Sequence, residues 1–182
     1  MKSYVILLRG INVGGKNKVS MAELKGYLEE LGFESVKTYI NSGNVLMDSD
    51  KSPQQIADLI EDLLPKKFRL DSSMIKVLVL SHDNLRSIIS HAPKGFGTEP
   101  DMYYCDVIFL MGITTEEALP VFAPREGVDH IWPGEGVVYS QRLAAERVKS
   151  RLNRIVGTPA YKSMTIRSWS TTTKLLALLD AN

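Results

Sequence analysis

The sequence repeats one apolar segment, and this repeat limits the possible folds more than any other feature. Residues 5–11 read Val-Ile-Leu-Leu-Arg-Gly-Ile, and residues 107–113, which lie 102 positions later (107 minus 5), read Val-Ile-Phe-Leu-Met-Gly-Ile. Each segment is apolar, rich in β-branched residues and ends near a glycine, which is typical of a buried strand that leaves the core. A chain of 182 residues has room for two small domains. The repeat therefore predicts two copies of one folding unit.

The first repeat is followed by the signals of a helix, a hairpin, a second helix and a strand. Ser20 and Glu23 form a capping box at the start of an amphipathic helix, and Gly32 is placed to end it. Residues 41–44 read Asn-Ser-Gly-Asn, which is typical of a tight turn between two strands. The elements predicted for the first copy are a strand at 5–8, a helix at 21–31, strands at 36–40 and 45–47, a helix that begins at 52–53 and a strand at 75–80.

The second repeat is followed by the same order of signals. After the repeated strand, the predicted elements are a short helix near 115–122, strands at 128–132 and 137–140, a helix at about 143–156 and a strand near 164–166. Both copies therefore have the order strand-helix-strand-strand-helix-strand, which is that of a ferredoxin-like sandwich. We predict an α+β fold of two fused ferredoxin-like (βαββαβ) sandwiches from an internal duplication, with an extra C-terminal helix at 168–179.

The repeat also sets the predicted domain boundaries. The first ferredoxin-like unit, with a loop rich in glycine and lysine, is predicted at 1–81, and a linker with a short helix at 82–102. Residues 103–182 are predicted to form the second unit, with a basic C-terminal segment and the extra helix. The alternative is a chance match of two apolar strands, but the shared element order favours duplication.

The two copies differ most just after the repeated strand, where the first inserts residues 12–19, Asn-Val-Gly-Gly-Lys-Asn-Lys-Val. A glycine-rich loop between a strand and a helix N-terminus suits an anion, and Arg9, in place of Met111, adds hydrogen-bond donors. Residues 10–16 also match the start of a P-loop. Asn17 replaces the hydroxyl residue that would meet magnesium, so a nucleotide triphosphatase is not predicted. The alternative is an ordinary solvated loop.

Polar side chains also distinguish the first hairpin from the second. Alternation along the strand predicts that Lys37, Tyr39 and Asn41 share one face. A cation beside an aromatic ring is a minimal stacking surface for a base or sugar, and Ser42 and Asn44 add hydrogen-bonding groups. The other interpretation is that Asn-Ser-Gly-Asn is simply favourable turn chemistry.

The net charge of +1 conceals charge segregation along the chain. Residues 142–174 carry eight basic side chains and one acidic one, whereas residues 99–135 carry eight acidic and one basic. Arg147, Arg151 and Arg154 have the spacing of one stripe on the predicted helix, and arginine suits phosphate. The alternative is a solvated face that pairs with the acidic segment.

Hydroxyls and cations also gather where the last predicted helix begins. Ser168 is placed as the N-cap, with Arg167 and Lys174 nearby, and a helix N-terminus attracts anions. Trp169 is interpreted as a packing anchor or, alternatively, as a stacking platform for a ligand.

Composition excludes several classes of protein. Cys105 is the single cysteine, which rules out an intramolecular disulfide and disfavours a thiolate zinc site. No apolar run approaches the roughly 18 residues of a membrane span, and no signal peptide is recognised, so we expect a cytoplasmic protein without membrane contact. His82, His91 and His130 show no ligand spacing, so neither a metal nor a cofactor is predicted, and the sequence leaves catalysis undecided.

Three motifs resemble a known family. Residues 7–15 read Leu-Leu-Arg-Gly-Ile-Asn-Val-Gly-Gly, residues 38–45 read Thr-Tyr-Ile-Asn-Ser-Gly-Asn-Val, and Arg167-x-Trp169 with Lys174-Leu175 lies near the C-terminus. With these motifs, the chain as a whole resembles the bacterial domain of unknown function 1697 family. The resemblance implies a compact α+β protein of two units and carries no activity. The chain departs from the pattern at Ser168, Ser170 and Thr172, where the family is expected to show Asn, Asn and Val.

We therefore expect an anion-binding protein that holds a phosphorylated small molecule or a nucleic acid between the 9–18 loop and the basic 142–174 segment. The alternatives are a metal-independent enzyme that acts on a small phosphorylated metabolite and a protein-interaction module, including a homodimer. The predicted ligand-binding residues are Arg9, Asn12, Lys16, Lys18, Tyr39, Ser42, Asn44, Arg147, Arg151, Arg167, Trp169 and Lys174.

Overall fold

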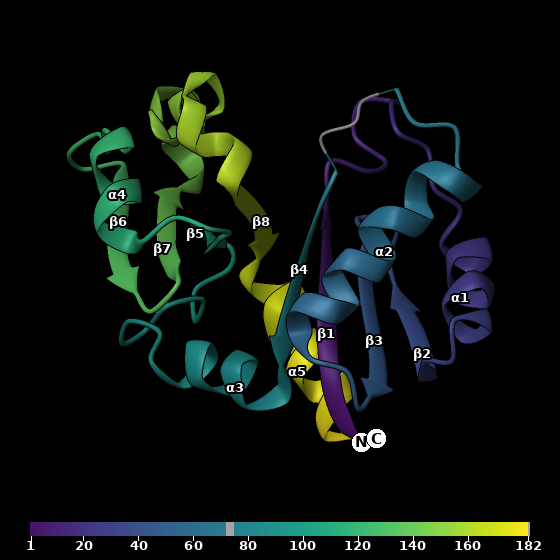
Figure 1. Cartoon of the computed structure of the whole chain (residues 1–182). Coiled ribbons are helices and arrows are strands. Elements are labelled where there is room, and N and C mark those ends of the chain that lie inside the picture. Colours follow the sequence, from purple (N-terminus) through teal and green to yellow (C-terminus); the bar gives the residue numbers. More distant parts are fainter. Residues whose placement is uncertain (72–74, 182) are drawn as a thin grey trace. The chain divides into compact units, whose positions relative to one another are not determined.

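The computed structural model describes residues 1–71 and 75–181, and the contacts within the chain divide it into two compact units (Figure 1). The first unit comprises Met1–Leu85 and Leu175–Asn182, and the second comprises Arg86–Lys174. This division differs from the predicted boundaries, which placed residues 175–182 in the second unit. Within the described ranges, no helix combines the length and apolar character needed to cross a membrane.

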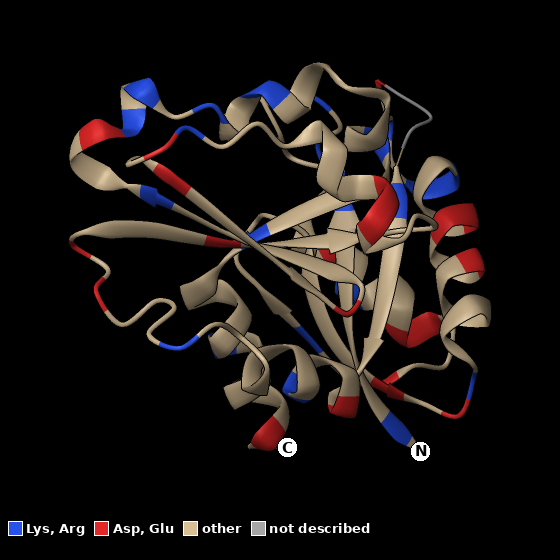
Figure 2. Cartoon of the chain, turned by 90° about the vertical axis from the view of Figure 1, so that its left-hand side faces the viewer, with Lys and Arg blue, Asp and Glu red and all other residues tan. Residues whose placement is uncertain are grey.

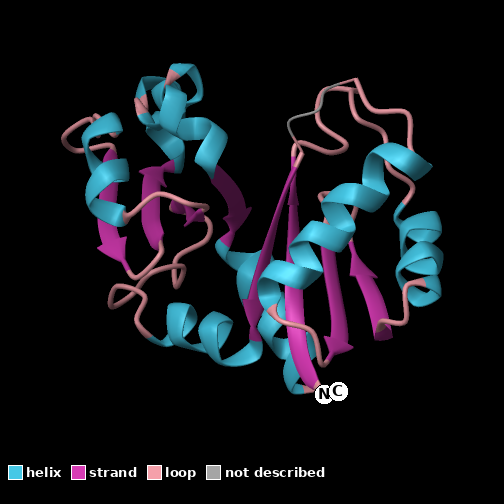
Figure 3. Cartoon of the chain, viewed as in Figure 1, coloured by secondary structure: helices cyan, strands magenta, loops and turns pink. Residues whose placement is uncertain are grey.

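The first unit contains a four-stranded antiparallel sheet in the order β2-β3-β1-β4 (Figure 3). Its central strand β1 pairs with β3 on one side and β4 on the other. The elements of this unit are β1 (Lys2–Arg9), α1 (Met21–Glu30), β2 (Glu34–Tyr39), β3 (Asn44–Ser49), α2 (Pro53–Lys67) and β4 (Lys76–Ser81).

Local sequence signals set the ends of α1 as predicted. The Ser20 hydroxyl accepts a hydrogen bond from the backbone N–H of Glu23 at 3.3 Å, which satisfies one of the unpaired amides of the first turn. Gly32 follows the helix with a φ of +83°, and the N–H of Phe33 donates to the carbonyl of Leu28 at 3.2 Å. This pattern closes the helix with a left-handed glycine. The N-cap at Ser20 and the end at Gly32 are confirmed, and of the predicted capping box the Ser20 half is formed.

Both faces of β1 are buried. Tyr4, Ile6 and Leu8 belong to the core that the sheet shares with α1 and α2, and the intervening Val5 and Leu7 are fully buried as well. Period-two alternation places these two sets on opposite faces of the sheet. The run is therefore apolar throughout because neither face of this strand meets water.

The C-terminal half of helix α5 (Trp169–Asp180) belongs to the first unit. Leu175 and Leu179 are buried, with 1% and 3% of their surfaces exposed. Near the end of the helix, the Asp180 carboxylate lies 2.6 Å from Nε2 of His82, the first residue of α3 (His82–Ser90). The first unit is thus built from two separate stretches of the chain.

The second unit repeats the strand order of the first, as β6-β7-β5-β8, again fully antiparallel. The predicted α+β class is confirmed by these two four-stranded sheets and their helices. The elements of this unit, besides parts of α3 and α5, are β5 (Tyr103–Leu110), α4 (Thr115–Ala118), a 3-10 turn (Leu119–Val121), β6 (Asp129–Gly134), β7 (Val137–Leu143) and β8 (Met164–Ser168).

An equivalent backbone hydrogen bond joins the central strand to the hairpin turn in both units. In the first unit, the N–H of Leu8 donates to the carbonyl of Gly43 at 2.8 Å, and in the second, the N–H of Leu110 donates to that of Gly136 at 2.9 Å. Leu8 and Leu110 are equivalent in the repeat, since they also lie 102 positions apart. The repeated letters therefore mark repeated backbone geometry.

The helix predicted at 143–156 is wrong. This segment forms 3-10 turns at Ala144–Lys149 and Leu152–Gly157, followed by a third at Pro159–Ser163. The buried carboxylate of Asp129 accepts a hydrogen bond from the N–H of Arg151 at 2.8 Å, and Ser150 is extended with a ψ of 143°. Both features interrupt an α-helix here, because a remote side chain takes a backbone donor that a helix would use internally.

The predicted arginine stripe fails with the helix. In a regular helix, Val148 would lie on the apolar face with Leu152 and Ile155, but Val148 is 86% exposed, whereas Leu152 and Ile155 are buried. Arg147, Arg151 and Arg154 therefore do not form one face of a regular helix.

The β2–β3 turn approaches β1 closely at Gly43. Its φ is +82°, and a Cβ there would lie 2.9 Å from Cβ of Leu8 and 3.0 Å from the Leu8 carbonyl oxygen. Replacing Gly43 by Ala should lower the free energy of unfolding in urea by about 2–4 kcal/mol, because left-handed strain adds to overpacking. Gly32→Ala is the matched control, since Gly32 has the same backbone sign and open space around it. A loss of only about 1–2 kcal/mol in both variants would show that the close contact adds nothing.

Candidate functional site

The first unit gathers its predicted site residues at one end of the sheet. β1 ends at Arg9, β4 begins at Lys76, and the turn between β2 and β3 spans 40–43, so the connections that flank these points lie at the same end. We call this region, made of residues 9–20, 39–44, 68–71 and 75–76, the loop end. It contains seven of the predicted residues, namely Arg9, Asn12, Lys16, Lys18, Tyr39, Ser42 and Asn44.

The glycine pair forms the tip of the loop after β1. The N–H of Lys16 donates to the carbonyl of Val13 at 3.0 Å, and the φ angles of Gly14 and Gly15 are +57° and +76°. Two consecutive left-handed residues within such a turn are typical of type I′, which glycine adopts without strain. The tip is therefore a miniature hairpin that leaves Lys16 exposed.

Asn12 holds this loop in place. Its side-chain amide donates to the carbonyls of Val19 and Asn41, both at 2.9 Å, and its side-chain oxygen accepts from the N–H of Val19 at 2.8 Å. The residue has a φ of +52°, a conformation that asparagine tolerates better than most residues. Asn12 therefore has a scaffolding role: two of the bonds tie the loop to its own residue Val19, and the bond to the Asn41 carbonyl joins the loop to the β2–β3 turn.

A second asparagine joins the loop to the segment before β4, and sequence analysis missed it. The N–H of Asn17 donates to the Asp71 carboxylate, and the N–H of Asp71 donates to the side-chain oxygen of Asn17, both at 2.7 Å. The Asn17 amide also donates to the carbonyl of Gly10 at 2.8 Å. The available signal was the polar residue within the loop, but its partner lies 54 positions away.

The hairpin turn is also built around a buried amide. Asn44 is fully buried, and its amide donates to the Tyr39 carbonyl at 3.0 Å and to the Ser42 hydroxyl at 2.9 Å. The predicted face of Lys37, Tyr39 and Asn41 is wrong at its last member. β2 ends at Tyr39, and Ile40 has a φ of +49°, so the strand alternation stops before Asn41.

Positive charge is concentrated at the loop end. The segments of the loop end carry five basic side chains and one carboxylate. The basic residues are Arg9, Lys16, Lys18, Arg69 and Lys76, and the carboxylate is that of Asp71. Within the described residues, Lys16, Lys18, Arg69 and Lys76 form no ion pair with a carboxylate. Figure 2 colours Lys and Arg blue, and blue bands occur at this end of the first unit.

The equivalent end of the second unit lacks this concentration. Met111 follows β5 where Arg9 ends β1, and the β6–β7 turn contributes Glu135. Lys162 is the basic side chain of the 3-10 turn Pro159–Ser163 that precedes β8, and Arg147, Lys149, Arg151 and Arg154 lie earlier in the connection from β7. The two copies therefore share a backbone plan and differ in charge at this end.

The remaining five predicted residues belong to the second unit. Arg147, Arg151 and Lys174 are exposed, whereas Arg167 is 7% exposed. The Arg167 guanidinium donates to the Thr165 hydroxyl at 3.0 Å and to the Ile166 carbonyl at 2.9 Å. Burial lowers the pKa of Arg167 to about 10, which still leaves it charged at neutral pH.

Trp169 is a packing anchor in the second unit. Its ring meets that of Phe96 edge to face, with centroids 5.1 Å apart, and Phe96 also contacts Trp132 and Tyr139. Gly97 lies against the Trp169 ring so closely that a Cβ there would fall 1.9 Å from Cδ1. Part of the predicted 82–102 linker is thus built into the second unit.

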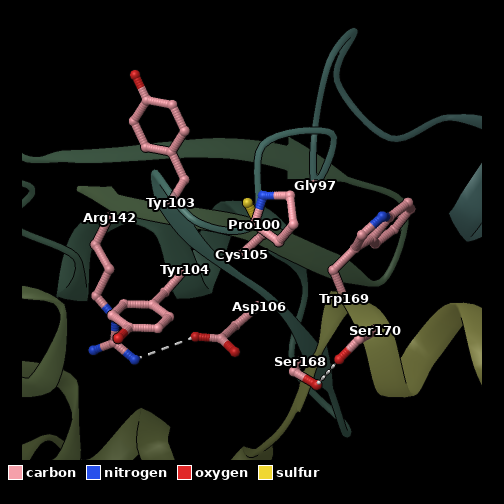
Figure 4. Close-up of a pocket in the computed structure, with 10 residues that line it drawn as sticks. All are labelled: Gly97, Pro100, Tyr103, Tyr104, Cys105, Asp106, Arg142, Ser168, Trp169 and Ser170. Atoms are coloured by element: carbon pink, nitrogen blue, oxygen red, sulfur yellow. Dashed lines mark hydrogen bonds and ion pairs between the residues drawn. The ribbon is translucent and has the colours of Figure 1, made fainter. Parts of the chain in front are cut away.

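Trp169 also lines a cavity of about 260 Å³ that sequence analysis did not foresee (Figure 4). Asp106 lies within it, and its carboxylate is 3.4 Å from Nη2 of Arg142. Burial raises the pKa of Asp106, although the positive charge of Arg142 opposes this shift. The residues around the cavity are Gly97, Pro100, Tyr103, Tyr104, Cys105, Asp106, Arg142, Ser168, Trp169 and Ser170.

The single cysteine has the properties of a buried structural residue. Its surface is 9% exposed, its Sγ lies 3.6 Å from the side-chain oxygen of Gln141, and burial raises the pKa of the Cys105 thiol. A raised pKa keeps the thiol protonated and unreactive at neutral pH. In the part of the chain that the structure describes, no three His, Cys, Asp or Glu residues are grouped to hold a metal ion.

The scaffolding role of Asn12 can be separated from the exposed charge of Lys16. Asn12→Ala should lower the free energy of unfolding by about 1–3 kcal/mol, because the carbonyls of Val19 and Asn41 and the N–H of Val19 lose their partner. Lys16→Ala should change it by less than about 0.5 kcal/mol. Urea titrations monitored by circular dichroism compare the two. Equal stability of both variants would contradict the role given to Asn12.

Comparison with known proteins supports the overall resemblance and adds no activity. A family model described as "Protein of unknown function (DUF1697)" matches residues 1–139. The chain is similar to a solved structure, "The structure of conserved bacterial protein SP0830 from Streptococcus pneumoniae", with 28% identity, a TM-score of 0.82 and coverage of 98% of each chain. No curated protein matches the chain. Since the family model covers residues 1–139 of 182, the chain belongs to the DUF1697 family of proteins of unknown function.

Proposed function

We propose that this protein binds phosphate groups of a nucleic acid at the loop end of the first unit. The observation that carries the proposal is a set of four exposed or half-buried cations, Lys16, Lys18, Arg69 and Lys76, that form no ion pair with a carboxylate among the described residues. Asn12 and Asn17 brace the loop that carries Lys16 and Lys18. Binding a polyanion releases counterions, so a local cluster of lysine and arginine is sufficient even when the net charge is near zero.

The bracing of the loop favours binding because it limits what must be ordered. The side-chain amides of Asn12 and Asn17 fix the backbone on both sides of Lys16 and Lys18. A cation on a preformed loop loses less backbone freedom when it meets a phosphate than one on a loose segment would. Tyr39, half-buried at the same end, adds an aromatic ring for stacking a base or sugar.

We further propose that the two units are ferredoxin-like sandwiches that arose by internal duplication. The shared strand order, the 102-residue offset of the repeated strand and the equivalent bonds of Leu8 and Leu110 support this origin. The second helix of the motif is replaced by 3-10 turns in the second unit, so the motif is complete only in the first. Two units that arose by duplication share one backbone plan, and this plan does not require different charges at their equivalent ends. The charge difference therefore favours a functional role for the loop end.

Salt-dependent binding tests the proposal. A fluorescein-labelled 20-mer of deoxythymidylate should bind in an anisotropy titration at 50 mM salt, and the affinity should fall steeply by 200 mM. Removing two phosphate contacts in the double variant Lys16→Ala/Lys18→Ala should weaken binding about tenfold or more and reduce the slope of log K against log salt by about 1.4. Unlabelled adenosine monophosphate in competition distinguishes a small phosphorylated ligand from a polymer.

The matched control removes the same charge elsewhere on the first unit. Lys2 and Lys51 are exposed and lie beyond the opposite end of the sheet, since Lys2 begins β1 and Lys51 follows β3. Lys2→Ala/Lys51→Ala should keep both the affinity and the salt slope. Absence of binding by both the oligonucleotide and the monophosphate, or equal weakening in the two double variants, would overturn the proposed site.

A further inference from the structure

We propose that the cavity of the second unit binds a single guanine-type base, recognised by Asp106 and Arg142. This inference concerns residues other than those of the loop end, and it needs no phosphate, so it stands or falls separately from the proposed function. It rests on the size and walls of the cavity, on an unpartnered carboxylate oxygen and on the donor–acceptor pattern beside it.

The size and walls of the cavity suit one planar ring system. Its volume of about 260 Å³ lies just below the roughly 300–1,000 Å³ of pockets that hold drug-sized ligands. Trp169, Tyr103 and Tyr104 contribute aromatic surface, and Pro100 contributes an apolar edge. Aromatic side chains bind bases by stacking, because every base presents a π-face.

The polar part of the cavity is an incompletely satisfied carboxylate. Oδ2 of Asp106 meets Arg142, but among residues 1–71 and 75–181 no donor bonds to Oδ1. The side chain is only 23% exposed, and burial raises its pKa. Oδ1 is accessible to solvent at the cavity, so it is an acceptor that a ligand with N–H donors can reach.

Arg142 provides the complementary donor next to this acceptor. Its guanidinium lies 5.7 Å from the centroid of the Tyr104 ring and donates to Asn153 at 3.3 Å. Its Nε is buried and has no partner among the described residues. In Figure 4, Asp106 lies between Arg142 with Tyr104 on one side and Ser168 with Trp169 on the other.

This acceptor-and-donor pair matches one base edge best. Guanine presents a carbonyl acceptor, a ring N–H and an exocyclic amino group in a row, so the amino and ring N–H groups can donate to the carboxylate while the carbonyl accepts from the guanidinium. Uracil has no exocyclic amino donor, and adenine has no carbonyl. The geometry therefore favours guanine over both.

The wall that Trp169 forms is fixed before any ligand arrives. Gly97 and Phe96 hold the ring, and the Ser168 hydroxyl accepts from the N–H of Thr171 at 3.2 Å, which caps α5 at the edge of the cavity. Ser170 lies 3.1 Å from Ser168 between their hydroxyl oxygens. Because this wall is already ordered, binding of a small ligand loses less side-chain conformational entropy.

Tryptophan fluorescence tests the proposal directly. The chain has two tryptophans, and Trp132 does not line the cavity, so Trp132→Phe leaves Trp169 as the sole reporter. Titration of this full-length variant with guanosine should quench the emission saturably at submillimolar concentration. Inosine, which lacks only the exocyclic amino group, should bind at least tenfold more weakly, as should adenosine and uridine.

Variants in the same background identify the residue that reads the base. Asp106→Asn should weaken guanosine binding at least tenfold, whereas Asp101→Asn, which changes an exposed aspartate outside the cavity, should leave it unchanged. Thermal melts of both variants show whether each one folds. If Asp106→Asn does not fold, the comparison of guanosine with inosine still tests the proposal, because it uses the protein with Asp106 unchanged. No saturable quenching up to 1 mM guanosine, or equal affinities for guanosine, inosine and uridine, would overturn the inference. A short oligonucleotide of deoxyguanylate then distinguishes a base within a strand from a free nucleoside.

Discussion

The backbone hydrogen bond between the end of the central strand and the hairpin turn is the interaction that both units share, and in the first unit the approach is especially close. In the first unit the N–H of Leu8 reaches the carbonyl of Gly43, and the space between them leaves no room for a Cβ. This contact fixes where β1 leaves the sheet and therefore where the following loop begins. Because the same bond recurs between Leu110 and Gly136, both units present a loop at an equivalent point, and each can carry different side chains there.

The first unit uses its polar side chains in two ways. The side-chain amides of Asn12, Asn17 and Asn44 donate hydrogen bonds to backbone carbonyls and thereby shape the loops. Within residues 1–71 and 75–181, the side chains of Lys16 and Lys18 make no such bonds, and both residues are exposed. A substitution in the first group changes the positions of many atoms, whereas one in the second removes a charge and little else. Separating scaffold from charge in this way is what makes a site of surface lysines open to a clean test.

Structural features that depend on residues close together in the sequence were predictable, and features that depend on distant partners were not. The caps of α1 at Ser20 and Gly32 follow from local hydrogen bonding, and the hairpin turn follows from its Asn-Ser-Gly-Asn sequence. The helix expected at 143–156 had suitable periodicity, but Asp129 takes the amide of Arg151, and no local signal announces that competition. The cavity was missed for the same reason, since its walls come from a supposed linker, from β5 and from the start of α5. That the 39–44 turn lies at the same end of the sheet as the 9–18 loop was not predicted, and it follows from the strand order β2-β3-β1-β4.

The discontinuity of the first unit has a consequence for its synthesis. Leu175, Leu179 and Asp180 contribute to this unit, although they are translated after every residue of the second. During synthesis, a segment of residues 1–85 therefore lacks two leucines that are buried in its own unit. The surface that they cover waits for residues that are made after all those of the second unit.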